Sequence, residues 1–450
     1  MKIINSNEFD EYWKKLPRHE EEQAVDVLVK EIIAAVRNEG DEAVKRYAAK
    51  FDKASPQALE VPPELVMEAL AGLKKEDAAL AEALAYSAQN IKCFAMLQKE
   101  QFKDFESSPS PGLFTGQRVI PVEKAAVYVP GGRFPLISSA LMGLIPAFVS
   151  GVEELFLASP PGGSGNAEPM PGFLRILAAA ALAAETCGRE LPRVFQAGGA
   201  QAIAALAFGT ESIPRCDVIV GPGNKYVAAA KRIIFGEAGI DFVAGPTDVL
   251  IISDGFDRGR GALPGAVRLI AADMLAQAEH DADARARALV PDRQMADAIV
   301  SALETGLGAR GGGSPAALSL EAGGLIIIYK DMAEAVRIAN VIAPEHLELQ
   351  VEEGRRWISS LKNYGSLFVG AAAAEVLGDY SAGINHTLPT SGSARFTGGL
   401  SVRHFLKTVT SLRCEEGAGL QRALDAARVI ARAEGLGFHA QSAEARQAPR

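Results

Sequence analysis

This 450-residue chain has no long apolar runs and few cysteines, and its acidic residues outnumber its basic ones. The four cysteines, Cys93, Cys187, Cys216 and Cys414, form no CxxC pair, which suits a reducing compartment. No apolar stretch is long enough to span a bilayer, and the amino-terminal sequence MKIINSNEFDEYWKKL lacks the apolar centre of a signal peptide. The formal net charge of -9, without a basic patch interleaved with aromatic residues, argues against nucleic-acid binding. We therefore expect a soluble, cytoplasmic protein that binds neither membranes nor nucleic acid.

Several motifs of common enzymes are also missing. The sequence has no HExxH, no GxSxG and no candidate catalytic cysteine with a histidine nearby, which disfavours the common hydrolase mechanisms. No GxGxxG follows a predicted strand, so the standard dinucleotide fingerprint is absent. The function has to be inferred from less common arrangements of residues.

Strands, glycine turns and helices alternate in the middle of the chain. Predicted strands run into the turns VPGG after Tyr128, AGGA from Ala197 and GPGN from Gly221. This order predicts a doubly wound parallel sheet. The turns would then meet at the carboxyl edge of the sheet, where the backbone can approach a nucleotide and helix starts favour its phosphates. Alternatively, the glycines serve only tight packing between strands and helices.

The same alternation extends over most of the chain. Loops are predicted at 160–171, 256–264 and 306–315. Strands are predicted at 155–158, 193–196, 217–220, 249–252, 325–329 and 366–370. Helices are predicted at 24–37, 63–95, 137–149, 173–184, 267–279, 332–342 and, in one or two pieces, from 418 to 450. These elements predict an α/β protein of about two to four domains or subdomains.

Histidine is scarce as well, and five of the six histidines lie in the C-terminal part of the chain. The sequence from Ala343 to His346 places a carboxylate beside an imidazole, directly after Pro344. Because proline is favoured in the first turn of a helix, we expect Glu345 and His346 at a helix start, which favours ionised glutamate and lowers the pKa of histidine. Both would then be bases near neutral pH, suited to taking protons from two different species. The alternative is a helix-capping glutamate beside a packed surface histidine.

Side chains of chemically useful types recur at three other places. Gln277 and His280 lie one turn apart on a predicted helix and suit either a zinc site or a polar pair at a helix end. A glycine-bounded loop carries Asp379 and His386, an unusual density of functional groups for a connector. His439 follows a glycine that ends a helix, where a histidine can simply stabilise the helix end. Each signal is weak when it is taken alone.

Ordered motifs along the chain resemble those of the histidinol dehydrogenase family. The resemblance runs from about Val25 to Arg446, nearly the whole chain. Its motifs are YVPGG at Tyr128, AGGAQAIAA at Ala197, VGPGN at Val220, AGPTDVL at Ala244, LAQAEHD at Leu275, APEHLEL at Ala343, GDYSAGINHTLPT at Gly378, GLSVRHFLK at Gly399 and AEGLGFHA at Ala433. So many segments in the family's order make a chance resemblance very improbable.

The resemblance implies a zinc- and NAD-dependent enzyme that oxidises L-histidinol through L-histidinaldehyde to L-histidine with two NAD, the last step of histidine biosynthesis. His346 would be the base for the alcohol step, and Glu345 would activate the water that attacks the aldehyde. One zinc ion per subunit would be held by Gln277, His280, Asp379 and His439. The substrate would contact these ligands and also Thr247, His346, His386 and Glu434. NAD would contact Tyr128, Gln201 and Asn224.

The resemblance also implies a homodimer with shared active sites, because the family's C-terminal tail crosses to the partner and brings Glu434 and His439 to its site. We expect an α/β fold of two incomplete, doubly wound Rossmann-like domains with parallel sheets, plus small helical segments at the N- and C-terminal ends of the chain. The expected division is an N-terminal segment of residues 1–23, a discontinuous catalytic domain of residues 24–127 and 248–398, an NAD-binding domain of residues 128–247, and a dimer-crossing tail of residues 399–450.

The chain departs from the family pattern at a few positions. The sequence at 133–139 differs from the usual run, Ala95 stands where histidine is frequent, Thr247 replaces serine, and Ile384 precedes the Asn-His pair. The catalytic pair and the presumed zinc ligands remain. The departures leave open a paralogue that oxidises another polyol or amino alcohol with the same zinc and NAD. Retention of the site residues argues against a catalytically silent binding protein.

Overall fold

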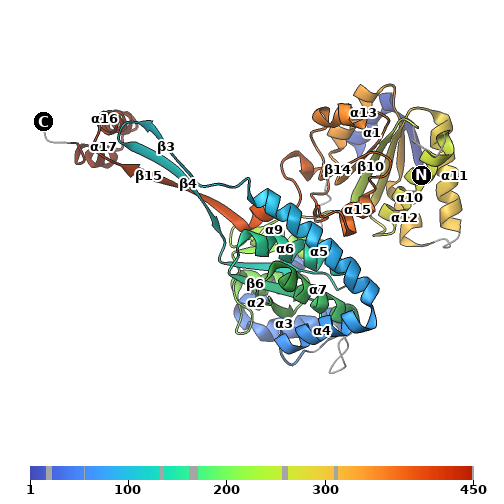
Figure 1. Cartoon of the computed structure of the whole chain (residues 1–450), viewed down its shortest axis with the longest axis horizontal. Helices are drawn as coiled ribbons and strands as arrows, with labels where there is room; N and C mark the ends of the chain where they lie inside the picture. The colour runs from blue at the N-terminus through green and yellow to red at the C-terminus, as the bar shows by residue number, and fades with distance from the viewer. Residues whose placement is uncertain are drawn as a thin grey trace.

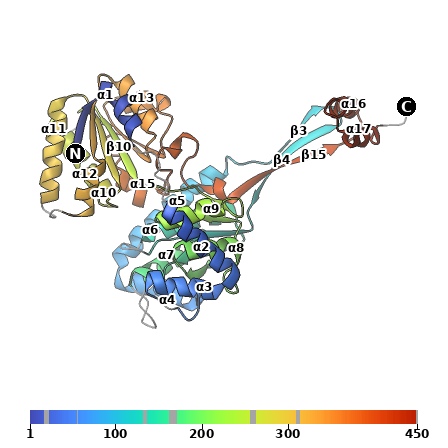
Figure 2. The ribbon, with the colours of Figure 1, turned by 180° about the vertical axis from the view of Figure 1, so that it is seen from behind.

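The computed structural model describes residues 1–16, 23–54, 56–131, 136–161, 171–255, 262–308 and 313–447. The chain forms two α/β domains, from which a narrow arm extends (Figure 1, Figure 2). The N-terminus lies in one domain and helix α17 (Gly437–Glu444), near the end of the described residues, at the tip of the arm. No helix within the described ranges is long and apolar enough to cross a membrane. The loops predicted at 160–171, 256–264 and 306–315, and the unusual sequence at 133–139, lie partly outside the described residues.

The first domain is built on a parallel sheet of six strands, which confirms the predicted parallel arrangement. In spatial order the strands are β1 (Lys2–Asn5), β12 (Leu325–Ile328), β11 (Arg285–Val290), β10 (Asp248–Ser253), β13 (His346–Gln350) and β14 (Ser366–Val369). One face packs against α10 (Ala262–Ala278), α11 (Arg293–Gly308) and α12 (Pro315–Gly323), and the other against α1 (Ser6–Lys15) and α13 (Met332–Ile342). The short helices α14 (Gly354–Trp357) and α15 (Glu375–Tyr380) follow β13 and β14.

Strand β13 presents two different faces. Leu347 and Leu349 are fully buried in the same apolar cluster as α13. His346, Glu348 and Gln350 alternate with them and therefore point to the α10 side, where Gln350 bonds to a residue of α10. These polar side chains are buried too. Because burying polar groups costs free energy unless they have partners, this row points to a functional site on the α10 side of the sheet.

The second domain contains the other sheet of six strands. In spatial order these are β2 (Glu60–Val61), β7 (Arg193–Gln196), β6 (Glu154–Ser159), β5 (Lys124–Tyr128), β8 (Val218–Val220) and β9 (Gly239–Ile240). β2 is antiparallel to β7, and the other neighbours are parallel. One face packs against α4 (Pro63–Glu76), α5 (Ala78–Lys99), α6 (Ile137–Ser150) and α7 (Pro171–Cys187). The other packs against α2 (Gln23–Glu39), α3 (Asp41–Tyr47), α8 (Gly199–Phe208) and α9 (Lys225–Ile234).

The arm is a three-stranded antiparallel ribbon with two helices at its tip (Figure 1). Its strands are β3 (Phe105–Ser110), β4 (Leu113–Pro121) and β15 (Leu406–Cys414), and its helices are α16 (Ala418–Ala433) and α17 (Gly437–Glu444). Leu400 and Phe405 pack into the core of the second domain and anchor the base of the arm. At the tip, Ile430 is 58% exposed and Phe438 is 85% exposed. Such exposed apolar side chains on a projecting element are typical of a surface that meets another molecule.

The division of the chain between the domains differs from the expected one in two places. β1 pairs with β12, so residues 1–16 form part of the first domain and not a separate segment. The apolar faces of α2 to α5 are buried against the second sheet, so the assignment of residues 24–127 to the catalytic domain is wrong. Sequence patterns show that these helices have apolar faces, but not which sheet covers them.

Candidate active site

Glu345 and His346 lie at the amino end of an interior strand, β13, and not at a helix start. Helix α13 ends at Ile342, and Ala343 adopts a left-handed conformation with φ of 53°. The chain then passes through Pro344 into β13. The expected helix start is therefore wrong, because a proline just beyond a helix C-terminus is as typical as a proline in a first turn.

Three carboxylates surround the His346 ring. Its Nδ1 lies 3.6 Å from Glu375 Oε1 and 3.9 Å from Glu345 Oε2, and its Nε2 lies 3.6 Å from Asp379 Oδ1. Both ring nitrogens are buried without a hydrogen-bond partner among the described residues. Buried polar atoms are rarely left unpaired in folded proteins. The ring therefore has the surroundings of a catalytic or ligand-binding side chain.

The same surroundings shift the acid–base properties of the site. Burial lowers the pKa of His346, but the charges of Glu375, Glu345 and Asp379 outweigh this and raise the pKa well above its ordinary value. Burial raises the pKa of Glu345 to about 7 and that of Glu375 to about 8. For Glu345 and His346 these shifts are opposite to those expected. The expectation placed both residues in the field of a helix start, whereas they lie in a buried cluster of carboxylates.

Glu345 is held in place by residues at the start of β10. Its Oε2 accepts hydrogen bonds from Thr247 Oγ1 at 2.5 Å and from the backbone N–H of Asp248 at 3.0 Å. The backbone N–H of Glu345 donates to Asp248 Oδ1 at 3.2 Å, and Asp248 forms a buried ion pair with Arg287 at 3.0 Å. Because the two bonds to the side chain engage Oε2, Oε1 is the oxygen that can take a proton from water.

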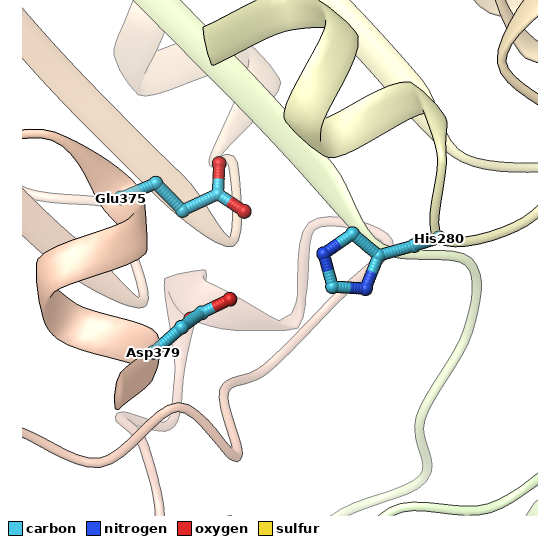
Figure 3. Close-up of side chains that lie close together, drawn as sticks. All are labelled: His280, Glu375 and Asp379. Atoms are coloured by element: carbon cyan, nitrogen blue, oxygen red, sulfur yellow. The ribbon is translucent and has the colours of Figure 1, made fainter. Parts of the chain in front are cut away.

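Three side chains of this site form a candidate metal-binding group. His280, Glu375 and Asp379 point toward one another (Figure 3), and their donor atoms all lie within 4.8 Å of one another. His280 follows the end of α10, whereas Glu375 and Asp379 lie four residues apart on α15. An imidazole with two carboxylates is a donor set that suits zinc.

The amide of Gln277 fits a cation at the same place. With Nε2 donating to Thr247 Oγ1 at 2.7 Å, its Oε1 faces the carboxylate oxygens of Glu375. If the amide is reversed, it donates to those oxygens at 2.6 and 2.9 Å and accepts from Thr247. A hydroxyl has one proton, so only the first orientation leaves Thr247 able to donate to Glu345. In that orientation either a cation or the proton of a Glu375 carboxyl group satisfies the amide oxygen. The donor set of Gln277, His280, Glu375 and Asp379 therefore fits zinc.

His386 is held between the two domains. Its Nδ1 lies 2.9 Å from the backbone carbonyl of Asp379, and its Nε2 lies 3.1 Å from Ser139 Oγ on α6. Burial lowers the pKa of His386. A neutral ring that donates from Nδ1 and accepts at Nε2 satisfies both contacts. His386 thus borders the site and holds its loop against the second domain, while its contact with a substrate stays a prediction.

The three residues predicted to contact NAD line one cavity of about 360 Å³ in the second domain. Tyr128 ends β5, Gln201 lies in the first turn of α8, and Asn224 immediately precedes α9. The Tyr128 hydroxyl accepts a hydrogen bond from the Gly199 N–H at 3.0 Å, and the Asn224 side chain caps α9. The glycine turns therefore meet at the carboxyl edge of the sheet, where they were expected.

Two predicted site residues lie elsewhere in the chain. Glu434 and His439 are exposed and flank the start of α17 at the tip of the arm, away from both domains (Figure 1). The chain's own fold brings together the other predicted residues of the first-domain site, Thr247, Gln277, His280, Glu345, His346, Asp379 and His386. It also adds Glu375, which the sequence prediction missed. The signal available for Glu375 was its spacing of one helical turn from Asp379.

Comparisons with known proteins agree with this architecture. The family model for histidinol dehydrogenase matches residues 16–447. The histidinol dehydrogenase of Thermus thermophilus is 43% identical over 423 residues, which cover 94% of this chain and 95% of the relative. That of Aquifex aeolicus is 41% identical over 430 residues, which cover 95% and 93%. The crystal structure of histidinol dehydrogenase from Elizabethkingia anophelis has a TM-score of 0.86 at 31% identity and covers 99% of this chain and 97% of that chain.

Two α/β domains, a buried carboxylate–histidine site in one and a glycine-lined cavity in the other are, together with these matches, the features of an oxidoreductase. The chain belongs to the histidinol dehydrogenase family. The resemblance noted in the sequence is thereby confirmed over nearly the whole chain.

Proposed function

We propose that this enzyme oxidises L-histidinol to L-histidine through L-histidinaldehyde, with zinc and two molecules of NAD. The observation that carries the proposal is the position of two different buried bases, Glu345 and His346, beside the donor group of His280, Glu375 and Asp379. Two successive oxidations need proton acceptors at two stages. The site supplies one base for each stage.

In the first stage the neutral ring of His346 takes the proton of the alcohol. A zinc ion held beside Glu375 and Asp379 would partly offset the carboxylate charges that raise the pKa of His346 and would favour this neutral ring. Its ring nitrogens are buried and face carboxylates at 3.6 Å without hydrogen-bonding to them. The imidazolium that forms is stabilised by the negative charges of Glu375 and Asp379. A general base positioned in this way typically accelerates a reaction by roughly 100- to 10,000-fold.

In the second stage Glu345 activates the water that adds to the aldehyde. A carboxyl group whose pKa lies at about 7 is a stronger base than an exposed carboxylate and is still partly ionised near neutral pH. Thr247 and the Asp248 N–H hold Oε2, so the proton of the water goes to Oε1. Glu345 and His346 therefore act on different substrates within one buried site.

Gln277, His280, Asp379 and Glu375 are the groups of this chain that would hold zinc, with His439 of a second copy as the remaining predicted ligand. Tyr128, Gln201 and Asn224 line the cavity for NAD. When bound, zinc would coordinate the amine and imidazole of the substrate, and NAD would accept the hydride. The protein's own part is to orient the substrate and to move the protons.

The active form in this proposal is a homodimer. Glu434 and His439 lie at the tip of an arm that projects from its own domains, and apolar side chains such as Ile430 and Phe438 are exposed there. A second copy that received this tip would bury the apolar surface and complete its active site. Sharing active sites in this way requires both domains and the arm, and all three are present in this chain.

A comparison of substrates tests the proposed function. Zinc-loaded enzyme with NAD should form NADH from L-histidinol with a kcat/KM at least about 100-fold above that for amino alcohols without an imidazole, because a site built to bind a polar group rejects analogues that lack it. NADH formation is followed by absorbance. A preference for another polyol or amino alcohol would contradict the proposal and would favour a paralogue of the family.

A further inference from the structure

One carboxylate in the NAD cavity is not used by the proposed mechanism. Asp52 is the last residue of the π-helix Ala48–Asp52, which follows α3, and it lines the cavity together with Tyr128 and Gln201. The contact that the described residues give its carboxylate is a long one, 3.4 Å from Gln201 Nε2 to Asp52 Oδ2. A half-buried carboxylate with so weak a partner costs free energy. Such a carboxylate is suited to bind a hydrogen-bond donor of a ligand.

The chemistry of the cavity restricts which part of a dinucleotide can lie beside Asp52. Burial raises its pKa to about 6, so the carboxylate is largely ionised near neutral pH. An ionised carboxylate repels phosphate and accepts hydrogen bonds from hydroxyl groups. The pyrophosphate is better placed at the glycine turns that precede α8 and α9, where helix starts favour anions. The part left for Asp52 is the sugar, whose hydroxyls are donors.

The side of the sheet on which the cavity lies shows which sugar this is. Leu28 and Phe51 line the cavity from α2 and the π-helix, on the face of the sheet that carries α8 and α9. The catalytic domain contacts the opposite face, where Ser139 of α6 meets His386. A dinucleotide that reaches the catalytic residues crosses the sheet edge, so its nicotinamide lies toward α6. The adenosine half then lies in the cavity, against apolar and aromatic side chains that suit adenine.

We propose that Asp52 binds the ribose hydroxyls of the adenosine half of NAD and makes this enzyme selective for NAD over NADP. The inference rests on the proposed function, which places NAD in this cavity, and it names the group that distinguishes the two cofactors. A 2′-phosphate would replace a hydroxyl donor with a dianion beside the carboxylate, so that attraction becomes repulsion. Dinucleotide enzymes with a GxGxxG turn use an acidic residue for the same purpose, and Asp52 would do so from an unrelated element.

Binding of cofactor fragments tests this inference without depending on turnover. The full-length, zinc-loaded enzyme is titrated by calorimetry with ADP-ribose and with 2′-phospho-ADP-ribose, neither of which carries nicotinamide. Asp52→Asn should weaken binding of ADP-ribose by about ten-fold or more, the effect expected for loss of a charge-assisted hydrogen bond. Binding of 2′-phospho-ADP-ribose should be unchanged or tighter. The preference of the enzyme for ADP-ribose over 2′-phospho-ADP-ribose should therefore fall by at least about ten-fold.

Matched variants separate this outcome from general damage. Glu42→Gln removes one negative charge from the exposed surface of neighbouring α3 and should change neither affinity. Asp52→Glu keeps the charge and should keep the discrimination against the 2′-phosphate, and thermal melting checks that each variant is folded. Equal weakening of both probes by Asp52→Asn, or no change in either, would overturn the inference and leave the proposed function standing. If the unmodified enzyme bound neither probe, the NAD cavity itself would be refuted.

Discussion

Glu345 and His346 are adjacent in the chain but differ in which of their side-chain atoms are already hydrogen-bonded. The Glu345 side chain is bonded at Oε2 by Thr247 and by a backbone N–H, whereas the His346 nitrogens have carboxylates near them and no hydrogen bond within the described residues. The first arrangement suits a base that acts on water through its other oxygen. The second suits a base that acts directly on a substrate hydroxyl.

Exchange of each base should therefore slow a different half-reaction. His346→Asn should reduce histidinol oxidation by about 100-fold or more while affecting histidinaldehyde oxidation much less, and Glu345→Gln should show the reverse pattern. The two half-reactions are measured separately by supplying the alcohol or the aldehyde with NAD. Equal losses in both half-reactions for either variant would exclude this division of roles.

Glu375 should matter for zinc although the family pattern did not suggest it. Glu375→Gln removes a buried carboxylate donor from the group with His280 and Asp379, and we expect zinc affinity to fall by about 10- to 100-fold. Zinc content after dialysis against a weak chelator measures the change. Glu353→Gln, at an exposed position of the same domain, is the control. Full retention of zinc by Glu375→Gln would show that this carboxylate does not serve the metal.

The sequence was informative about which residues gather in the site, but not about their electrostatics. Motifs identified Gln277, His280 and Asp379 because their order along the chain is distinctive. Glu375 stands in an alanine-rich stretch, where nothing local separates a buried carboxylate from a solvated one. The direction of the pKa shift at His346 depends on Glu375 and Asp379, which come from another part of the chain, as well as on the adjacent Glu345, so it required the fold.

At the level of elements, a buried ion pair fixes the glycine turn that leads to α9. Gly221 donates its N–H to Asp241 Oδ2 at 2.8 Å, and its carbonyl accepts from Lys231 Nζ at 2.9 Å. Lys231 and Asp241 also contact each other, and both are buried. Gly221 has φ of 117°, and a Cβ there would lie 2.1 Å from the Tyr128 carbonyl oxygen. The turn, which leads to Asn224 in the lining of the cavity proposed for NAD, is thus held from both sides.

Gly221→Ala should damage both this turn and cofactor binding. A positive φ costs an alanine about 1 to 2 kcal/mol, and the clash with the backbone of β5 should add about 1 to 3 kcal/mol. Gly236→Ala is a matched control, because Gly236 has φ of 110° and no neighbour within 4 Å. Chemical denaturation and titration with ADP-ribose measure the two effects. Similar stability and affinity in both variants would argue against a sterically closed turn.

Regular elements were predicted well where the pattern was local and long. The strands predicted at 155–158, 193–196, 217–220, 249–252, 325–329 and 366–370 agree with β6, β7, β8, β10, β12 and β14, and the helix predicted at 137–149 agrees with α6. Strands β1, β9, β11 and β13 were not predicted. The ribbon of β3, β4 and β15 was missed because its third strand comes from a segment almost 300 positions further along the chain. The helix start expected at Pro344 was wrong because proline favours both ends of a helix, and only the left-handed Ala343 shows which end this is.

At the scale of the whole molecule, the two domains and the arm divide the functional groups. The carboxylate–histidine site lies in the first domain, the cavity proposed for NAD in the second, and Glu434 and His439 beside the start of α17 at the arm tip. Sequence patterns could not assign residues 1–16 and 23–127 to their domains, since an amphipathic helix fits any sheet with an apolar face. The layered packing decides that question, and it places both sites on well-buried scaffolds.

Mixed dimers should reveal whether the arm completes the other copy's site. His439→Ala and His346→Asn should each have low activity alone. A dimer with one chain of each kind should regain about half of the normal activity, because one of its two sites then combines an unmodified first domain with an unmodified arm tip. Activity of co-expressed, differently tagged chains is the measurement. Absence of any recovery would contradict shared active sites.

The two-stage oxidation itself is tested most directly by counting NADH formed for each L-histidinol consumed. Purified, zinc-loaded enzyme is allowed to exhaust a known amount of L-histidinol in excess NAD, and NADH and histidine are quantified. Two NADH and one histidine per histidinol are expected, because Glu345 and His346 provide a base for each oxidation. One NADH with accumulation of the aldehyde, or no NADH from enzyme that has bound its zinc, would contradict the proposed function.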